Sequence, residues 1–213
     1  WKITPGLSYG YSTNKLKLDL DNIANDENAA HLKLKFKKSF SDRIKLSFGG
    51  DYFITKFDED YIPNSGNSAV LGYNSTIAAV FTEADVFCSK KLAAKVGLRV
   101  SNNSLLDETP IAPRISLAYK IAKSSQFSLA YGDFTQIPKS DYIKYSKFYQ
   151  FESEKASHYI LNYQYNKNGK TLIAEAYYKD YSNLVKYDTP SVQYNSLFSN
   201  NGSGYAKGID LFW

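Results

Sequence analysis

Alternation of apolar and polar side chains organises the segment 112–138 of this chain. Up to residue 121 its odd positions are apolar, whereas its even positions carry small, polar or charged side chains that include Arg114 and Lys120. A polar break at residues 123–125 interrupts the alternation, which then resumes as far as Tyr131. Successive side chains of a strand point to opposite faces, so the segment predicts an antiparallel hairpin with one apolar and one polar face.

The same pattern recurs along the whole chain and predicts an all-β fold of about ten antiparallel strands. Two local features refine this prediction. The apolar positions change parity near residues 12–14, which indicates a bulge or a kink in the first strand. The dipeptide Asn168-Gly169 is a strong signal for a two-residue hairpin turn.

The expected connections between strands are short and long in turn. The short ones are turns at residues 39–42, 89–91, 123–125 and 166–169, and the long polar ones include residues 21–28, 58–73, 102–110, 136–153 and 182–203. A soluble sandwich has no reason to sort its connections in this way. A transmembrane barrel has one, because its periplasmic turns are short and its extracellular loops are long. The sorting therefore predicts a segment of a transmembrane antiparallel β-barrel.

Aromatic side chains are abundant, with 19 Tyr, 13 Phe and 2 Trp among 213 residues. In a barrel such side chains favour the two membrane interfaces. The strand directions predict a lower row with Trp1, Tyr119, Phe127, Tyr163 and Tyr165, and an upper row with Tyr9, Tyr11 and Tyr131. A mean hydropathy of −0.42 is compatible with this arrangement, since barrel strands are apolar only at alternate positions.

The net charge of +5 does not indicate nucleic-acid binding, because the lysines are spread along strands and turns rather than gathered in one stripe. The single Cys88 cannot form an internal disulfide, and the two histidines lie on different expected strands without a cysteine partner. The sequence contains no nucleophile elbow, phosphate loop or spaced carboxylate pair. We expect no catalytic residue, no cofactor and no metal site. Calcium held by the acidic stretches at residues 19–27 and 58–60 stays open as an alternative.

Two groups of residues are candidates for function. Charged side chains on the polar face of the strands are expected to line a lumen, because a charge facing lipid costs a few kcal/mol. They are Glu83, Asp85, Lys95, Arg99, Arg114, His158, Glu175 and Asp210. An aromatic loop supplies candidate ligand-binding residues, which are Tyr142, Lys144, Tyr145, Lys147, Phe148 and Tyr149. Exposed aromatic side chains indicate binding, with packing against neighbouring loops as the alternative.

A set of short motifs in a consistent order resembles a known family. The motifs are PRISL at 113–117, AYG at 130–132, QIP at 136–138, EKASHY at 154–159, EAYYK at 175–179, NL at 183–184 and GSGYAKGID at 202–210. Together they resemble the middle of the barrel of TonB-dependent outer-membrane receptors, in the style common in Bacteroidetes. The likeness covers nearly the whole chain, and its specificity lies in the ordered set rather than in any single motif.

The resemblance implies a closed barrel of about 22 strands with a plugged lumen, in the outer membrane of a Gram-negative bacterium. It implies energised import of a scarce nutrient, which could be a siderophore, cobalamin, a glycan or a peptide. Residues 1–213 are then a partial barrel domain, without the N-terminal plug that contacts the TonB complex and without the last strands. Outer-membrane lipid, lipopolysaccharide and a surface lipoprotein are the further partners that the resemblance suggests.

Two other functional classes stay open at this point. One is an outer-membrane barrel without a plug, such as a porin or an adhesin. The other is a soluble secreted β protein that binds glycans. A compact plug upstream of Trp1 in the full-length protein would separate the receptor from the porin, and partitioning into detergent would separate both from the soluble protein.

Overall fold

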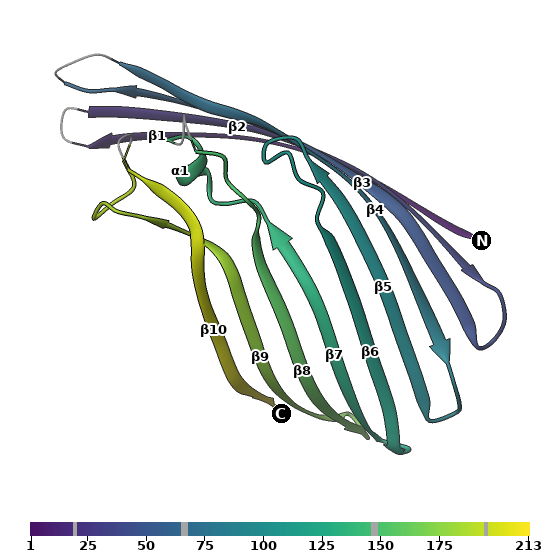
Figure 1. The fold of residues 1–213 in the computed structure, drawn as a ribbon. Helices are drawn as coiled ribbons and strands as arrows, with labels where there is room; N and C mark the ends of the chain where they lie inside the picture. The colour runs from purple at the N-terminus through teal and green to yellow at the C-terminus, as the bar shows by residue number, and fades with distance from the viewer. Residues whose placement is uncertain (19–20, 65–67, 146–148, 194–195) are drawn as a thin grey trace.

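The computed structural model describes residues 1–18, 21–64, 68–145, 149–193 and 196–213. Its ten strands form a single antiparallel sheet in sequence order (Figure 1). The strands are β1 (Lys2–Leu18), β2 (Asp21–Ser39), β3 (Ile44–Ile62), β4 (Ala69–Phe87), β5 (Leu92–Asn103), β6 (Ile111–Ala122), β7 (Ser125–Gln136), β8 (Glu154–Lys167), β9 (Lys170–Tyr187) and β10 (Phe198–Phe212), and a short helix α1 (Ser140–Ile143) precedes β8. The prediction of an all-β fold with ten antiparallel strands is confirmed. No described helix is long and apolar enough to cross a membrane.

The four short connections gather at one end of the sheet (Figure 1). They follow β2, β4, β6 and β8 and comprise residues 40–43, 88–91, 123–124 and 168–169. Asn168 and Gly169 have φ angles of 52° and 75°, the left-handed conformation that a tight two-residue hairpin requires. The predicted short turns at this end are therefore confirmed. The long connection expected after the first strand is wrong, because only residues 19–20 separate β1 from β2 at the opposite end.

The strands at the N-terminal side are longer than the sequence predicted. The expected loop at residues 21–28 is wrong, because β2 begins at Asp21, and most of the expected loop at 58–73 belongs to β3 and β4. The expected bulge near residues 12–14 is also wrong, because β1 pairs with β2 in one unbroken register.

Polar cross-strand contacts explain these extensions. The Tyr9 hydroxyl donates to the Asn28 side chain at 2.8 Å, and the Thr13 hydroxyl donates to the Asp26 carboxylate at 2.6 Å. In a strand whose two faces both meet water, such polar pairs stabilise the pairing of strands to a similar extent as apolar pairs do. Alternation of apolar side chains marks a strand only where one face is apolar and the other polar, so the polar ends of β1 to β3 do not show it.

The register divides the side chains between an outer and an inner face, since directly opposed residues of an antiparallel pair point the same way. A row of aliphatic side chains crosses the outer face from β6 to β10. It consists of Leu117, Leu129, Leu161, Ala176 and Ile209. Leu129 is 55% exposed and Ile209 is 74% exposed. Regular exposure of aliphatic side chains along a sheet is typical of a surface that meets lipid.

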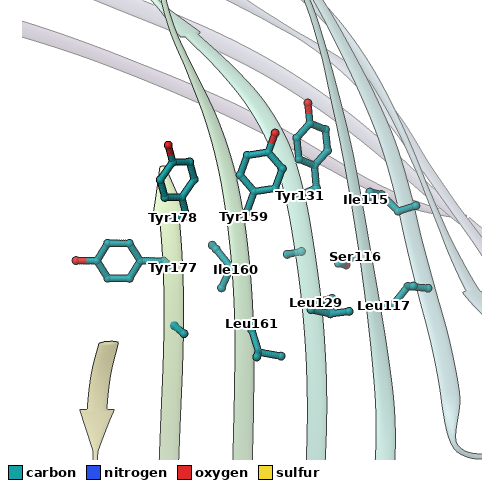
Figure 2. A pocket seen from close by; sticks show the side chains of 12 residues that line it. Ile115, Ser116, Leu117, Leu129, Tyr131, Tyr159, Ile160, Leu161, Tyr177 and Tyr178 are labelled. Carbon is teal, nitrogen blue, oxygen red and sulfur yellow. The ribbon is translucent and has the colours of Figure 1, made fainter. Parts of the chain in front are cut away.

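Two aromatic rows border this aliphatic row. Tyr131, Tyr159 and Tyr178 are opposed in register on one side of it, with ring centroids 5.1 Å and 6.2 Å apart. Figure 2 shows their hydroxyl groups pointing in the same direction, away from the leucines. On the other side Tyr119, Phe127 and Tyr163 are opposed in register. Tyr131 lies only four positions after Phe127 in β7, about 14 Å along the strand, which is less than the about 25 Å of the apolar band of a barrel. The assignment of an upper and a lower interface row therefore stays a prediction.

If the lipid-facing row of Leu117 lies near the bilayer midplane, Leu117→Arg should lower the free energy of unfolding of the full-length protein in a bilayer by about 2–4 kcal/mol. Ser116→Arg, one position along on the inner face, should cost less than about 1 kcal/mol. Denaturant titration of reconstituted protein measures both values. Equal tolerance at the two neighbouring positions would contradict the assignment of faces.

The free and exposed Cys88 in the turn between β4 and β5 is a natural probe of orientation. Its thiol should resist a bulky impermeant maleimide in intact cells and react once the outer membrane is permeabilised, because short turns of a barrel face the periplasm. Asn64→Cys in a Cys88→Ser background should label in intact cells, since residue 64 lies at the opposite end. Labelling of Cys88 in intact cells would contradict the predicted periplasmic position of the short turns.

Candidate functional site

All eight charged residues that were expected to face a lumen lie on the inner face of the sheet, opposite the aliphatic row. They are Glu83, Asp85, Lys95, Arg99, Arg114, His158, Glu175 and Asp210. Glu83, Arg114 and His158 share one cross-sheet row, in which Gly97 and Gly132 separate them. The geometry is compatible with the lumen assignment, which stays a prediction for the closed barrel.

Asp51 of β3 is the centre of one charge cluster on this face. Its side chain is only 4% exposed, and it binds Arg99 at 2.6 Å, His31 at 3.1 Å and Lys33 at 3.6 Å. A carboxylate so deeply placed requires such partners, because its desolvation is otherwise unfavourable. Asp51 was not among the residues predicted to line the lumen, although its position in β3 places it directly opposite Lys33 of β2.

A second cluster surrounds Lys95 of β5. Its ammonium group contacts Glu83 at 3.0 Å and Asp85 at 3.2 Å, and Lys37 of β2 contacts Asp85 at 3.6 Å. Cations and carboxylates alternate across the strands, so most charges of this part of the wall neutralise one another. The amide of Asn162 donates in turn to the Glu175 carboxylate at 3.3 Å.

Arg114 of β6 differs from its charged neighbours. Its guanidinium lies 4.6 Å from the ring centroid of Phe134, and that ring lies 4.6 Å from the imidazole of His158. No described carboxylate is within ion-pairing distance of Arg114. A Cβ atom at Gly132 would come within 3.2 Å of the Arg114 side chain, so glycine leaves room for this stack. Two hollows of about 210 Å³ and 160 Å³ adjoin the stack.

Of the connection 137–153, the described residues 137–145 and 149–153 lie over the inner face at the end opposite the short turns (Figure 1). The Lys144 ammonium binds Glu59 of β3 at 2.8 Å, and the Tyr73 hydroxyl of β4 donates to the Ser140 hydroxyl at 3.2 Å. On the other side the backbone N–H of Asn200 in β10 donates to the Tyr149 hydroxyl at 2.9 Å. The connection thus joins β3 and β4 to β10 across the concave side of the sheet.

The ion pair of Lys144 is well enclosed. Its side chain is 9% exposed and that of Glu59 is 4% exposed, and Lys144 also contacts Asp141 at 3.0 Å. Burial alone would lower the pKa of Lys144, but hydrogen bonds to Glu59 and Asp141 outweigh it and raise that pKa above its usual value. Lys144 therefore stays charged at neutral pH.

The other predicted ligand-binding residues have different surroundings. Tyr142 packs against Tyr187 at 5.8 Å and Phe198 at 6.4 Å between ring centroids, and the Tyr145 ring lies 5.1 Å from the Lys144 ammonium. A hollow of about 480 Å³ lies between this connection and residues 70–73 of β4, and Lys144 and Tyr149 line it. Lys147 and Phe148 lie outside the described residues.

An apolar hollow of about 520 Å³ on β6 to β9 is a poor candidate for a ligand site (Figure 2). It includes Leu117, Leu129 and Leu161 of the aliphatic row and the tyrosines above them. Because this surface faces outward, lipid acyl chains are its natural occupant. The acidic stretch 58–60 also fails to converge, since Glu59 points inward while Asp58 and Asp60 point outward. Among the described residues no group of three or more His, Cys, Asp or Glu side chains could hold a metal ion.

The family described as "TonB dependent receptor-like, beta-barrel" matches residues 1–213. The chain belongs to this family. The TonB-dependent receptor barrel is not an enzyme, and the chain is part of a protein of the Gram-negative outer membrane. No curated protein sequence matches the chain significantly.

Solved receptors share the fold of this barrel segment. The alcaligin outer membrane receptor FauA from Bordetella pertussis has a TM-score of 0.72 and 17% identity, and the match covers 99% of this chain and 40% of that one. The copper transporter OprC has a TM-score of 0.76 and 13% identity, with 98% and 39% covered. The ferric yersiniabactin uptake receptor FyuA from Yersinia pestis has a TM-score of 0.74 and 14% identity, with 98% and 36% covered. The chain thus spans less than half the length of these receptors.

Removal of one partner of the Lys144–Glu59 pair should loosen the connection over the receptor's inner face. We expect Glu59→Gln to cost about 1–3 kcal/mol locally, because it leaves an enclosed ammonium without its main partner. Hydrogen exchange should then accelerate at the amides of residues 142–144, which bond to the carbonyls of Lys139 and Ser140. Glu59→Gln combined with Lys144→Met should recover most of the protection.

Lys56→Gln serves as the control, because its partner Asp58 is exposed and an exposed pair contributes little. Additive effects of Glu59→Gln and Lys144→Met would show that the two side chains are not coupled.

Proposed function

We propose that this chain is the middle part of a receptor barrel that imports a scarce nutrient across the outer membrane with energy supplied from the inner membrane through TonB. The observation that carries the proposal is the family match along residues 1–213. The ten-stranded meander and the four short turns at one end of the sheet support it, because both are features of large outer-membrane barrels.

The chain supplies only a part of that barrel. Ten strands are fewer than the about 22 of a plugged transporter, and β1 and β10 are the two edges of the sheet. We assign residues 1–213 to a partial barrel domain and place the plug, the contact with the TonB complex and the last strands in other parts of the full-length protein.

The substrate is a siderophore, cobalamin, a glycan or a peptide. FauA and FyuA are named for alcaligin and ferric yersiniabactin, and OprC for copper, which supports a metal chelate such as a siderophore among these candidates. The Bacteroidetes-type assignment and a surface lipoprotein as partner rest on the sequence motifs. Outer-membrane lipid and lipopolysaccharide would cover the outer face with its aliphatic and aromatic rows.

The aromatic connection is the proposed place of ligand capture. Tyr145, Phe148 and Tyr149 would offer stacking surfaces, and Lys147 would offer charge to an acidic or polyol ligand. Lys144 is engaged with Glu59, so its proposed role is to hold the connection in place. A plug-less porin or adhesin is the alternative function, and the family match argues against it.

The proposal is tested by deleting the gene of the full-length receptor and measuring growth and uptake on defined sources of iron and of carbon. One source should be lost, and the same source should be lost in a strain without TonB. Uptake that continues without TonB would favour the porin.

A second experiment tests whether the connection 137–153 contributes to ligand binding. In the full-length receptor, Tyr145→Ala with Phe148→Ala should weaken binding of the identified substrate by about 1–3 kcal/mol through lost stacking, with an unchanged amount of folded receptor. Phe40→Ala in the turn between β2 and β3 is the matched control at the opposite end. Normal binding by the double variant would mean that the connection is only a packed rim.

A further inference from the structure

Basic side chains concentrate at the end of the sheet that carries the short turns. The four turns and their flanking positions comprise residues 38–45, 88–92, 120–125 and 166–171, all of which the structure describes. These segments contain Lys38, Arg43, Lys45, Lys90, Lys91, Lys120, Lys123, Lys167 and Lys170. Their only carboxylate is that of Asp42. We call these nine side chains the basic edge.

No ion pair between described side chains compensates the charges of the basic edge. The ion pairs between described side chains lie on the inner wall, at the mouth or on the upper part of β3, and none involves a member of the basic edge. Lys167 and Lys170 are directly opposed in register on either side of the Asn168-Gly169 turn. Like charges in opposed positions destabilise a hairpin, so an anion between them would relieve a cost that the fold otherwise carries.

The position of the basic edge relative to the aromatic rows suggests what that anion is. The Lys38 ammonium lies 4.9 Å from the Trp1 ring centroid and 4.7 Å from the Phe40 ring centroid, in the lower aromatic region. Lys167 and Lys170 follow directly below the opposed pair Tyr165 and Leu172 on the outer face. Side chains just beyond an aromatic row lie at the level of the lipid headgroups, where long basic side chains reach phosphate.

We propose that the basic edge binds anionic phospholipid headgroups in the periplasmic leaflet of the outer membrane. The outward and turn lysines, Lys90, Lys91, Lys167 and Lys170 above all, would each contact phosphate or an anionic headgroup. This contact would hold the lower rim of the barrel at a defined depth. The inference goes beyond nutrient uptake, and it depends on the membrane orientation of the chain rather than on any substrate.

The experiment compares two quadruple variants of the full-length receptor in phosphatidylcholine vesicles that carry spin-labelled phosphatidylglycerol or spin-labelled phosphatidylcholine. The edge variant combines Lys90→Gln, Lys91→Gln, Lys167→Gln and Lys170→Gln. The matched control combines Lys15→Gln, Lys17→Gln, Lys155→Gln and Lys186→Gln, four exposed lysines at the opposite end. Heat-modifiable electrophoretic mobility verifies that each barrel is folded.

The unaltered receptor should bind phosphatidylglycerol about three- to tenfold more strongly than phosphatidylcholine in the boundary shell at low salt, and much less selectively at high salt. The edge variant should lose most of this preference while the control keeps it. An equal loss in both variants, or a preference that the edge variant retains, would overturn the proposal. Binding of purified peptidoglycan that falls in the edge variant while lipid selectivity is unchanged would overturn it in favour of a cell-wall ligand.

Discussion

The structure depends on the need to pair every backbone N–H and C=O group inside a membrane, where no water can replace a missing partner. Within the part of the chain that the structure describes, consecutive strands meet this need with long antiparallel registers, such as the unbroken pairing of β3 with β4 from Ile44 to Tyr61. Register shifts occur only near the ends of strands, at residues 120–122 of β6 and 199–204 of β10. The register shifts are thus confined to strand ends, where water can hydrogen-bond to the unpaired N–H and C=O groups.

The membrane also determines which side chains each face of the sheet carries. Lipid requires apolar side chains outside, and this leaves every second position free to carry charge inside. Those charges lie close enough to pair, as Asp51 does with Arg99 and Lys95 does with Asp85. Tight approach of strands adds a steric limit on this face, since a Cβ atom at Gly49 would collide with the Leu34 carbonyl oxygen.

The sequence predicts strand faces and boundaries best in the segments that contact lipid. The faces of the segment around Leu117 and the turn at Asn168 were predictable, because lipid contact and left-handed backbone geometry each demand particular residue types. The part of β2 around Asp26 was not predictable as a strand, because both faces of the strand meet water there and no alternation of apolar side chains is imposed. The bond between Lys144 and Glu59 joins residues far apart in sequence, and no local pattern indicates it.

The strand wall and the connection 137–153 differ in how freely their side chains can vary. The wall is determined by alternation and by register, so its lipid-facing positions accept apolar side chains and disfavour charged ones. The mouth is held by a few long-range polar contacts between the connection 137–153 and the strands on either side of it. Residues such as Tyr145 lie between those anchoring contacts rather than in the register of the sheet. The proposed ligand capture by that connection could therefore be altered by new side chains on it, without any new pairing of strands.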